Sequence, residues 1–268
     1  MKTKTSSMAM VVGIGLALGS MTVHAAVDWT WTLNVAPTGS NLPSSAAVMG
    51  YSASGNSASI VSTAASGRPD LNWYGGGYGI CSTGDGATCG TAPDHAMDNN
   101  GYKESILLTF GNKVTLSSVD IDWSGSQNGY DGDISVLAYT GAGNPMSTSY
   151  DSIATALGNA NSGWKLIGNY ANTSQNVTPS VSLNTSVSAS YWLVAAYNSI
   201  FATGNACKDA TTGASATCGD SNDYVKLYAV AGTTGGGGKV PEPSALLLFG
   251  TGLMGLVGLR RRAKVNPA

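Results

Sequence analysis

The 268-residue chain contains little charge, since Asp, Glu, Lys and Arg together make up 10% of its residues. Between Ala26 and Lys239, fourteen acidic and seven basic side chains give a formal charge of −7. The value of −2 for the whole chain hides this excess, because the remaining basic residues lie near the two ends. A mildly acidic segment with scattered lysines lacks the basic patch that nucleic acid or an anionic membrane surface would attract, so we expect neither partner for it.

Histidine and the common hydrolase motifs are also scarce. The chain has two histidines, His24 and His95, and the first lies close to the N-terminus. A Ser-His-Asp triad would therefore depend on His95, yet no Gly-x-Ser-x-Gly nucleophile elbow is present. We expect a protein that is not an enzyme. The alternative is a secreted hydrolase that uses His95, or two facing carboxylates such as those of Asp120 and Asp122.

Helix signals are nearly absent, whereas strand signals recur along the chain. The segment Val27–Val35 alternates polar and apolar residues, which places every second side chain on one face. Gly111-Asn112-Lys113 separates two strand-like runs as a hairpin-like connection, and Asp151–Leu157 is the one segment with helical character, with Asp151 as its N-cap. Further strand-like runs are Ser105–Phe110, Val114–Trp123, Ile134–Tyr139, Trp164–Tyr170, Val181–Val187, Tyr191–Tyr197 and Tyr224–Val230.

Many short strands separated by turns predict an all-β fold, an antiparallel β-sandwich of jelly-roll-like type, rather than a parallel α/β sheet. Residues 26–231 are enough for one domain with a substantial core. The glycine-rich segment 232–239 is typical of a flexible linker, which would connect this domain to residues 240–268.

The N-terminus has the pattern of a signal peptide over residues 1–25. Lys2 and Lys4 precede an apolar run from Met8 to Leu18, and small residues follow at the cleavage position. Cleavage between Ala25 and Ala26 fits best. The chain is therefore predicted to be exported.

The C-terminal residues 240–268 contain three features in succession. Pro241-Glu242-Pro243 comes first, and the two prolines keep this segment out of a helix and extended. A largely apolar run of fifteen residues, Ala245–Leu259, would span about 22 Å as a helix, which is short for a hydrocarbon core of about 30 Å. Arg260, Arg261 and Arg262 follow, and would hold that end in the cytoplasm.

This succession resembles the PEP-CTERM sorting signal, the C-terminal tag of bacterial surface proteins handled by the membrane protease exosortase. An ordinary tail anchor is the alternative, but it does not explain the Pro-Glu-Pro boundary. The resemblance implies that exosortase is a partner and that Pro241-Glu242-Pro243 is the processing site. It further implies a Gram-negative producer of exopolysaccharide, a transient inner-membrane intermediate, and delivery to the cell surface or a biofilm matrix.

The four cysteines lie in the segment predicted to be exported, where disulfides persist. Three pairings are open. We favour Cys81–Cys89 and Cys207–Cys218, because each pair brackets a short turn-rich loop and each second cysteine lies in an Ala-Thr-Cys-Gly tetrapeptide. A zinc site is the alternative, but neither spacing matches a zinc knuckle.

Two further sites are predicted in the exported segment. Asp131 and Asp133, with Asn128 or with Asp94 or Asp98, offer the hard oxygen ligands of a structural calcium ion, although the strict EF-hand pattern is missing. Otherwise no cofactor is expected.

Large rings also gather in a glycine-rich loop. Trp73, Tyr74 and Tyr78 would stack on sugar rings if they were exposed together, as in a carbohydrate-binding or adhesive module. The alternative is that Trp73 packs into the core and the glycines only form a turn.

Overall fold

A computed structural model describes residues 27–62, 70–86, 89, 91–124, 130–146, 149–173, 181–201, 206–219 and 221–235. The predicted signal peptide with Ala25 and Ala26, the sorting signal, most of the linker and Asn128 lie outside these residues. Within them, no helix has both the length and the apolar character needed to cross a membrane.

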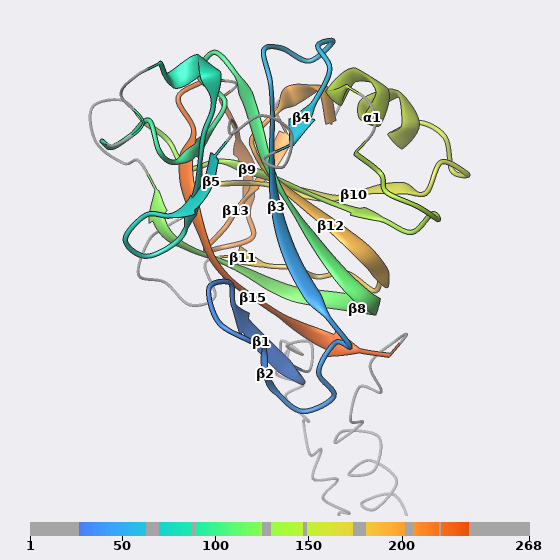
Figure 1. The fold of residues 1–268 in the computed structure, drawn as a ribbon. Coiled ribbons are helices and arrows are strands. Elements are labelled where there is room, and N and C mark those ends of the chain that lie inside the picture. Colours follow the sequence, from blue (N-terminus) through green and yellow to red (C-terminus); the bar gives the residue numbers. More distant parts are fainter. Residues whose placement is uncertain are drawn as a thin grey trace, which may run out of the picture.

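The described chain is mostly β-structure, which confirms the predicted all-β class (Figure 1). One α-helix, α1 (Tyr150–Leu157), and two 3₁₀ helices, η1 (Thr83–Asp85) and η2 (Ser199–Phe201), accompany the strands. The strands are β1 (Trp29–Thr32), β2 (Thr38–Gly39), β3 (Ala46–Ala53), β4 (Val61–Ser62), β5 (Asp70–Trp73), β6 (Tyr78–Cys81), β7 (Met97–Asp98), β8 (Lys103–Ser124), β9 (Ile134–Tyr139), β10 (Trp164–Ala171), β11 (Val181–Ser182), β12 (Ala189–Ala196), β13 (Ala206–Asp209), β14 (Ser215–Thr217) and β15 (Tyr224–Thr234).

Hydrogen bonds join these strands in one sheet with the main order β14-β13-β10-β9-β12-β8-β15-β1-β2. Among the described pairs only β10 and β13 run parallel, so the prediction of a purely antiparallel sheet is wrong there. The two strands are separated by β11, β12 and η2, a connection long enough for the crossover that parallel pairing needs. The jelly-roll-like sandwich itself stays a prediction.

β8 is a long strand whose two halves have different partner strands. Its first half pairs with β3 and β12, and its second half pairs with β15 and β11. Between Thr109 and Val114 the register with β12 shifts, and the Gly111 N–H donates to the Ser45 carbonyl. The predicted hairpin-like connection at 111–113 is therefore wrong: these residues stay within one strand as a bulge, and its two halves pair with different neighbours.

Side chains at alternate positions of β8 pack into two separate hydrophobic clusters. Ile106 and Leu108 enter the main core, which also contains Val119 and Ile121 from the second half of the strand and the fully buried Trp192. Residues of opposite parity, such as Leu107 of β8, enter a second cluster beneath α1. The part of the sheet around β12 is thus apolar on both faces, which explains its nearly continuous runs of apolar residues.

The helix lies where the sequence predicted one, but its cap differs. Ser149, not Asp151, is the N-cap of α1, and its hydroxyl accepts a hydrogen bond from the Ser152 N–H. Asp151 lies in the first turn, where a carboxylate is favourable near the helix N-terminus. Tyr150 and Ile153 anchor the helix in the second cluster.

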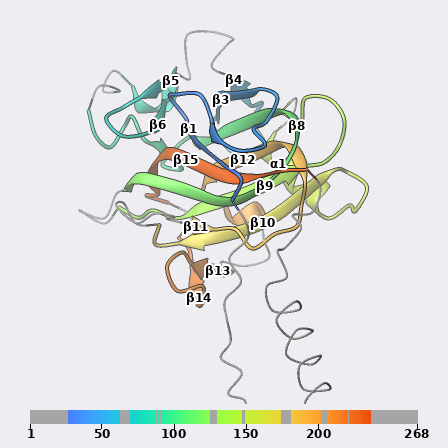
Figure 2. The ribbon, with the colours of Figure 1, turned by 90° about the horizontal axis from the view of Figure 1, so that it is seen from below.

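The two ends of the described chain meet at one edge of the sheet. β1 pairs antiparallel with the last part of β15, and Trp29 lies opposite Gly232 (Figures 1 and 2). β15 continues to Thr234, so the chain is still paired at 232, where the linker was predicted to begin. From Tyr224 to Thr234 the strand spans about 30 Å, which places residues near its beginning far from the edge where the linker leaves.

Candidate functional site

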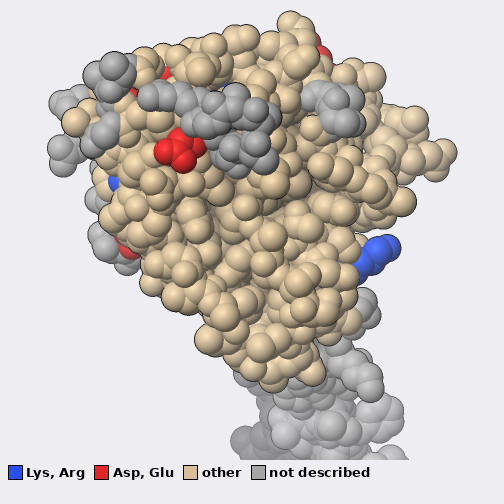
Figure 3. All heavy atoms as spheres, viewed as in Figure 1, with Lys and Arg blue, Asp and Glu red and all other residues tan. Residues whose placement is uncertain are grey.

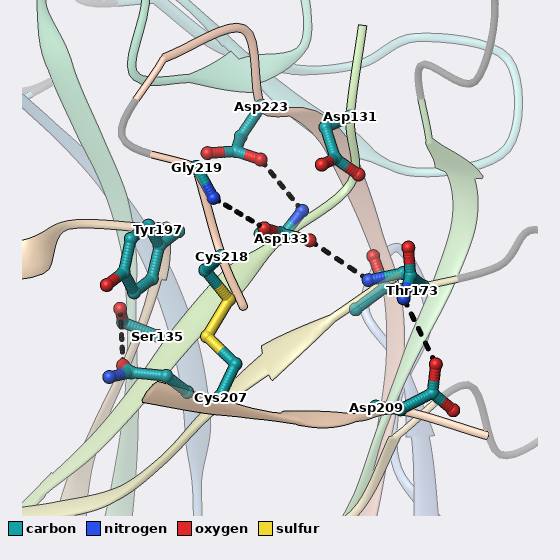
Figure 4. The surroundings of a disulfide bond; sticks show 12 residues. Asp131, Asp133, Ser135, Thr173, Tyr197, Cys207, Asp209, Cys218, Gly219 and Asp223 are labelled. Carbon is teal, nitrogen blue, oxygen red and sulfur yellow. Dashed lines mark hydrogen bonds between the residues drawn. A yellow bond between two sulfur atoms is a disulfide. The ribbon is translucent and has the colours of Figure 1, made fainter. Parts of the chain in front are cut away.

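Three carboxylates gather at the beginning of β15, at the end of the strand remote from the linker. Asp131 and Asp133 precede β9, and a bridge between Asp131 and Asp223 joins this segment to β15. One oxygen of each of the three side chains lies within 4.8 Å of the other two. The structure therefore brings together the predicted pair Asp131 and Asp133, and it adds Asp223 (Figure 4).

Backbone and amide N–H groups already surround this triad. The Asp133 carboxylate accepts hydrogen bonds from Asn172 N at 2.9 Å and Gly219 N at 3.1 Å. Asp223 accepts one from the Asp133 N–H at 3.0 Å and another from the Asn99 side-chain amide. All four carboxylate oxygens of Asp133 and Asp223 thus accept a hydrogen bond. The arrangement therefore fits a structural role, in which these side chains hold neighbouring segments together, better than a calcium site with free oxygen ligands.

Burial is the largest cause of the raised pKa values of Asp223 and Asp133. It raises the pKa of Asp223 to about 9, with the neighbouring Asp133 charge as the second cause, against hydrogen bonds that favour the ionised form. Burial also raises the pKa of Asp133 to about 6, although the Asn172 and Gly219 N–H groups act in the opposite direction. Asp223 therefore keeps its proton near neutral pH, which avoids a second buried negative charge beside Asp133.

A disulfide lies directly beneath the triad. Cys207 on β13 bonds Cys218, and the next residue, Gly219, donates to Asp133 (Figure 4). The second bond joins Cys81 and Cys89, so both predicted pairings are present, and the described cysteines include no free thiol. The Cys207–Cys218 bond thereby fixes one of the donors that hold Asp133.

Replacing Cys207 with serine should leave Cys218 as the one free thiol and keep Cys81–Cys89 intact. We expect the free energy of unfolding to fall by about 3 kcal/mol, because the disulfide closes a loop with a sequence separation of 11. Thiol titration of the denatured protein and a urea melt would check both points. Peptide mapping of the labelled thiol identifies its position, and a label on Cys81 or Cys89 instead of Cys218 would show that the remaining cysteines pair differently.

The predicted aromatic residues lie on the β5–β6 hairpin. Trp73 and Tyr78 face each other across it, with ring centroids 5.5 Å apart, and the Tyr228 ring of β15 lies 5.9 Å from Trp73. The tip contains Gly75 and Gly76, and both have a positive φ, a backbone conformation that is strained for residues with a side chain. The Tyr74 ring at the tip stacks on His95 at 4.7 Å.

These rings are neither fully exposed nor fully buried. Trp73 and Tyr78 pack one side against the main core, and all of Trp73, Tyr74 and Tyr78 keep part of their surface in solvent. Lys226 lies beside them: its ammonium group donates to the Tyr74 carbonyl and lies over the Trp123 ring at 5.1 Å. We call Trp73, Tyr74, Tyr78, Trp123, Lys226 and Tyr228 the aromatic face.

The residues considered for hydrolysis occupy different environments. His95 is half-buried against Tyr74, and burial lowers its pKa, with Lys226 as the second cause. Asp120 is buried in β8, whereas Asp122 is half-exposed, with its carboxylate beside Gly76 at the tip of the hairpin. The structure therefore places Asp122 next to the aromatic face.

One segment of the chain matches a known family model. Residues 239–262 match the model described as the PEP-CTERM protein-sorting motif. The chain carries a PEP-CTERM sorting motif. Neither a curated protein nor a solved structure gives a significant match to the chain.

The sorting motif indicates an exosortase-targeted protein that is exported and sorted to the surface of a Gram-negative bacterium. It begins shortly after β15 ends at Thr234, so the aromatic face and the acidic triad belong to the part of the molecule that precedes the motif. Charged residues are sparse on this part, and the face shown in Figure 3 has only a few scattered Lys, Arg, Asp and Glu side chains.

Sequence reasoning missed Asp223, Asn99 and a second acidic group formed by Asp85, Asp98 and Glu104. Asp223 lies 90 positions after Asp133, and only the pairing around β15 brings them together. A weak signal exists for Glu104, since it is a lone acidic residue at the beginning of a long apolar strand. Asp98, which was considered as a ligand beside Asp131, belongs to the second group instead.

Proposed function

We propose that the protein is a non-enzymatic surface or matrix protein that contacts the exopolysaccharide of the producing cell through its aromatic face. Exosortase recognises and processes Pro241-Glu242-Pro243, after the signal peptide 1–25 has been removed. The segment Ala245–Leu259 serves as a temporary inner-membrane anchor, with Arg260–Arg262 on its cytoplasmic side.

The aromatic face is the observation that carries this proposal. Sugar rings bind to aromatic rings that keep one side in solvent while the protein supports the other side. Trp73 and Tyr78 meet this condition, because they pack on the core and remain partly exposed. Asp122, which is half-exposed beside Gly76 at the tip of the hairpin, offers a polar partner for sugar hydroxyls.

The topology supports the same assignment. Both ends of the described chain leave from the edge formed by β1 and the end of β15. The β5–β6 hairpin pairs with β15 at Leu227, nearer the opposite end of that strand. A chain held at its C-terminus would thus present the aromatic face away from its attachment.

The test is co-purification with the cell's own exopolysaccharide. Replacing Trp73 and Tyr78 with alanine should weaken retention on the isolated polysaccharide by about tenfold or more, the equivalent of roughly 1.4 kcal/mol for the two lost stacking surfaces. A pull-down on immobilised polysaccharide, with the protein concentration varied, gives the apparent Kd.

Tyr139→Ala provides the matched control, because Tyr139 is another half-exposed ring and contacts Trp164 and Tyr191 in a different cluster. It should cost comparable stability without changing retention. Equal retention of the wild type and the Trp73/Tyr78 variant, or no retention of the wild type, would contradict the role of the aromatic face.

A further inference from the structure

A second acidic group lies next to the triad, and it differs from the triad because one of its buried carboxylate oxygens has no hydrogen-bond donor among the described residues. Asp85 ends η1, Asp98 ends β7, and Glu104 is the second residue of β8. One oxygen from each of the three side chains lies within 4.8 Å of the other two. Three segments of the chain thus meet at this point through their carboxylates.

Glu104 has a buried oxygen that the protein does not satisfy. The residue is 2% exposed, and its Oε2 atom accepts a hydrogen bond from the Asp98 N–H at 3.0 Å. Its Oε1 atom is buried and receives no hydrogen bond from any residue that the structure describes. A buried carboxylate oxygen without a donor is costly, so an unfilled ligand position is the expected explanation.

The local structure holds the other two carboxylates close to Glu104. The Asp85 carboxylate accepts from the Ser82 N–H at 2.6 Å in a capping box, which fixes it at the end of η1. Asp98 accepts from the Asn100 N–H at 2.8 Å. Gly84 permits close packing of this loop on the Tyr102 ring, where a Cβ atom would lie 2.1 Å from a ring carbon.

The balance of charge around the group is negative. Lys103 is the neighbouring cation, and its ammonium group donates to the Asn99 carbonyl at 2.9 Å. Asp94 adds a further negative charge that acts on Asp98. Burial first, and repulsion from Asp98 and Asp85 second, raise the pKa of Glu104, while the Asp98 N–H and the Ser82 side chain act in the opposite direction. A bound cation would remove this penalty.

We propose that Asp85, Asp98 and Glu104 bind a calcium ion that joins the Cys81–Cys89 loop to the end of β7 and the beginning of β8. The three ligands offer only oxygen atoms, which favours a hard cation over zinc or copper. Calcium tolerates irregular geometry and completes its shell with carbonyl groups and water, whereas magnesium requires a near-ideal octahedron. The site is separate from the Asp131–Asp133–Asp223 triad, whose buried oxygens already have donors.

The proposal can be tested by titrating calcium into the full-length chain. The protein is first freed of metal with EDTA and is kept in mild detergent at pH 7.5. Calorimetry should give a Kd of about 10⁻³ M or tighter, the range of extracellular calcium modules. At a hundredfold excess over Kd the Tm should rise by about 5 °C or more. Magnesium at the same concentration should give a smaller rise. A wild type that neither binds calcium nor gains thermal stability would overturn the proposal.

Glu104→Gln is the decisive variant, since it keeps the shape of the side chain and removes one negative ligand. It should weaken calcium binding at least tenfold, and in EDTA it should melt no lower than the wild type, because a buried charge is lost. Asp151→Asn, which neutralises an exposed carboxylate on α1, should leave calcium binding unchanged. Asp133→Asn tests the triad. If it abolished calcium binding while Glu104→Gln left binding intact, the ion would belong to the triad and the proposal would be wrong.

Discussion

A chain in which alanine replaces Pro241, Glu242 and Pro243 is expected to remain in the membrane fraction with its C-terminus intact. Proline does not fit into a helix interior, so we expect the native segment to be open to a protease, whereas three alanines would allow a helix to continue through it. We expect the processed form to fall at least tenfold, as measured by mass spectrometry of membrane and medium fractions. The folded domain should be unchanged, because β15 ends at Thr234.

The control for this experiment changes the linker without touching the sorting motif's Pro-Glu-Pro core. Replacing Gly236, Gly237 and Gly238 with alanine alters three residues nearby in the sequence and should leave processing close to normal. Release of the Pro-Glu-Pro variant at the wild-type rate would refute the assignment of residues 241–243 as the processing site.

The second large effect is a loss of stability as the pH rises, measured in EDTA. Burial raises the pKa of Asp223 from an ordinary value of 3.8 to about 9, so the folded protein keeps a proton that the unfolded chain has lost. The folded state therefore binds more protons between these values, and the free energy of unfolding falls as the pH rises from about 4 to 9. The group contributes a slope of about 1.4 kcal/mol per pH unit in that window. Urea melts at pH 5, 7 and 8.5 would measure it.

Two substitutions of Asp223 separate charge from hydrogen bonding. Asp223→Asn removes the titrating group and can still accept from the Asp133 N–H, so its stability should vary less with pH and exceed that of the wild type at pH 8.5. Asp223→Ala removes the acceptor of the Asp133 N–H and of one N–H of the Asn99 side-chain amide, and should cost about 1–3 kcal/mol for each at every pH. An asparagine variant with the same pH slope as the wild type would contradict the raised pKa.

Features that depend on neighbouring residues could be predicted from the sequence. Cys81–Cys89 and Cys207–Cys218 each close a short loop, so spacing and turn chemistry were sufficient to identify the pairs. The strand at residues 134–139 follows from its own apolar residues in the same way. The sorting motif is also a linear pattern, which explains why the sequence resemblance and the family model agree on it.

Features that depend on distant pairing could not be predicted. Whether 111–113 forms a hairpin loop or a bulge inside β8 depends on β12, whose register shifts opposite these residues. The parallel contact of β10 with β13 likewise requires the full path of the chain. For the site, Asp131 and Asp133 were identified from their own neighbourhood, whereas Asp223 joins them only because β15 begins beside Asp131.

The central claim is that the protein is exported, sorted by its C-terminal motif and released to the surface in processed form. Its most direct test is the intact mass, with mapping of both terminal peptides, of the protein recovered from the envelope and the medium of the native host. We expect a chain that begins at Ala26 and ends near Pro241–Pro243. Recovery from the surface and medium of a chain that still contains Arg260–Arg262 would contradict it, and would show the C-terminal segment to be a lasting anchor.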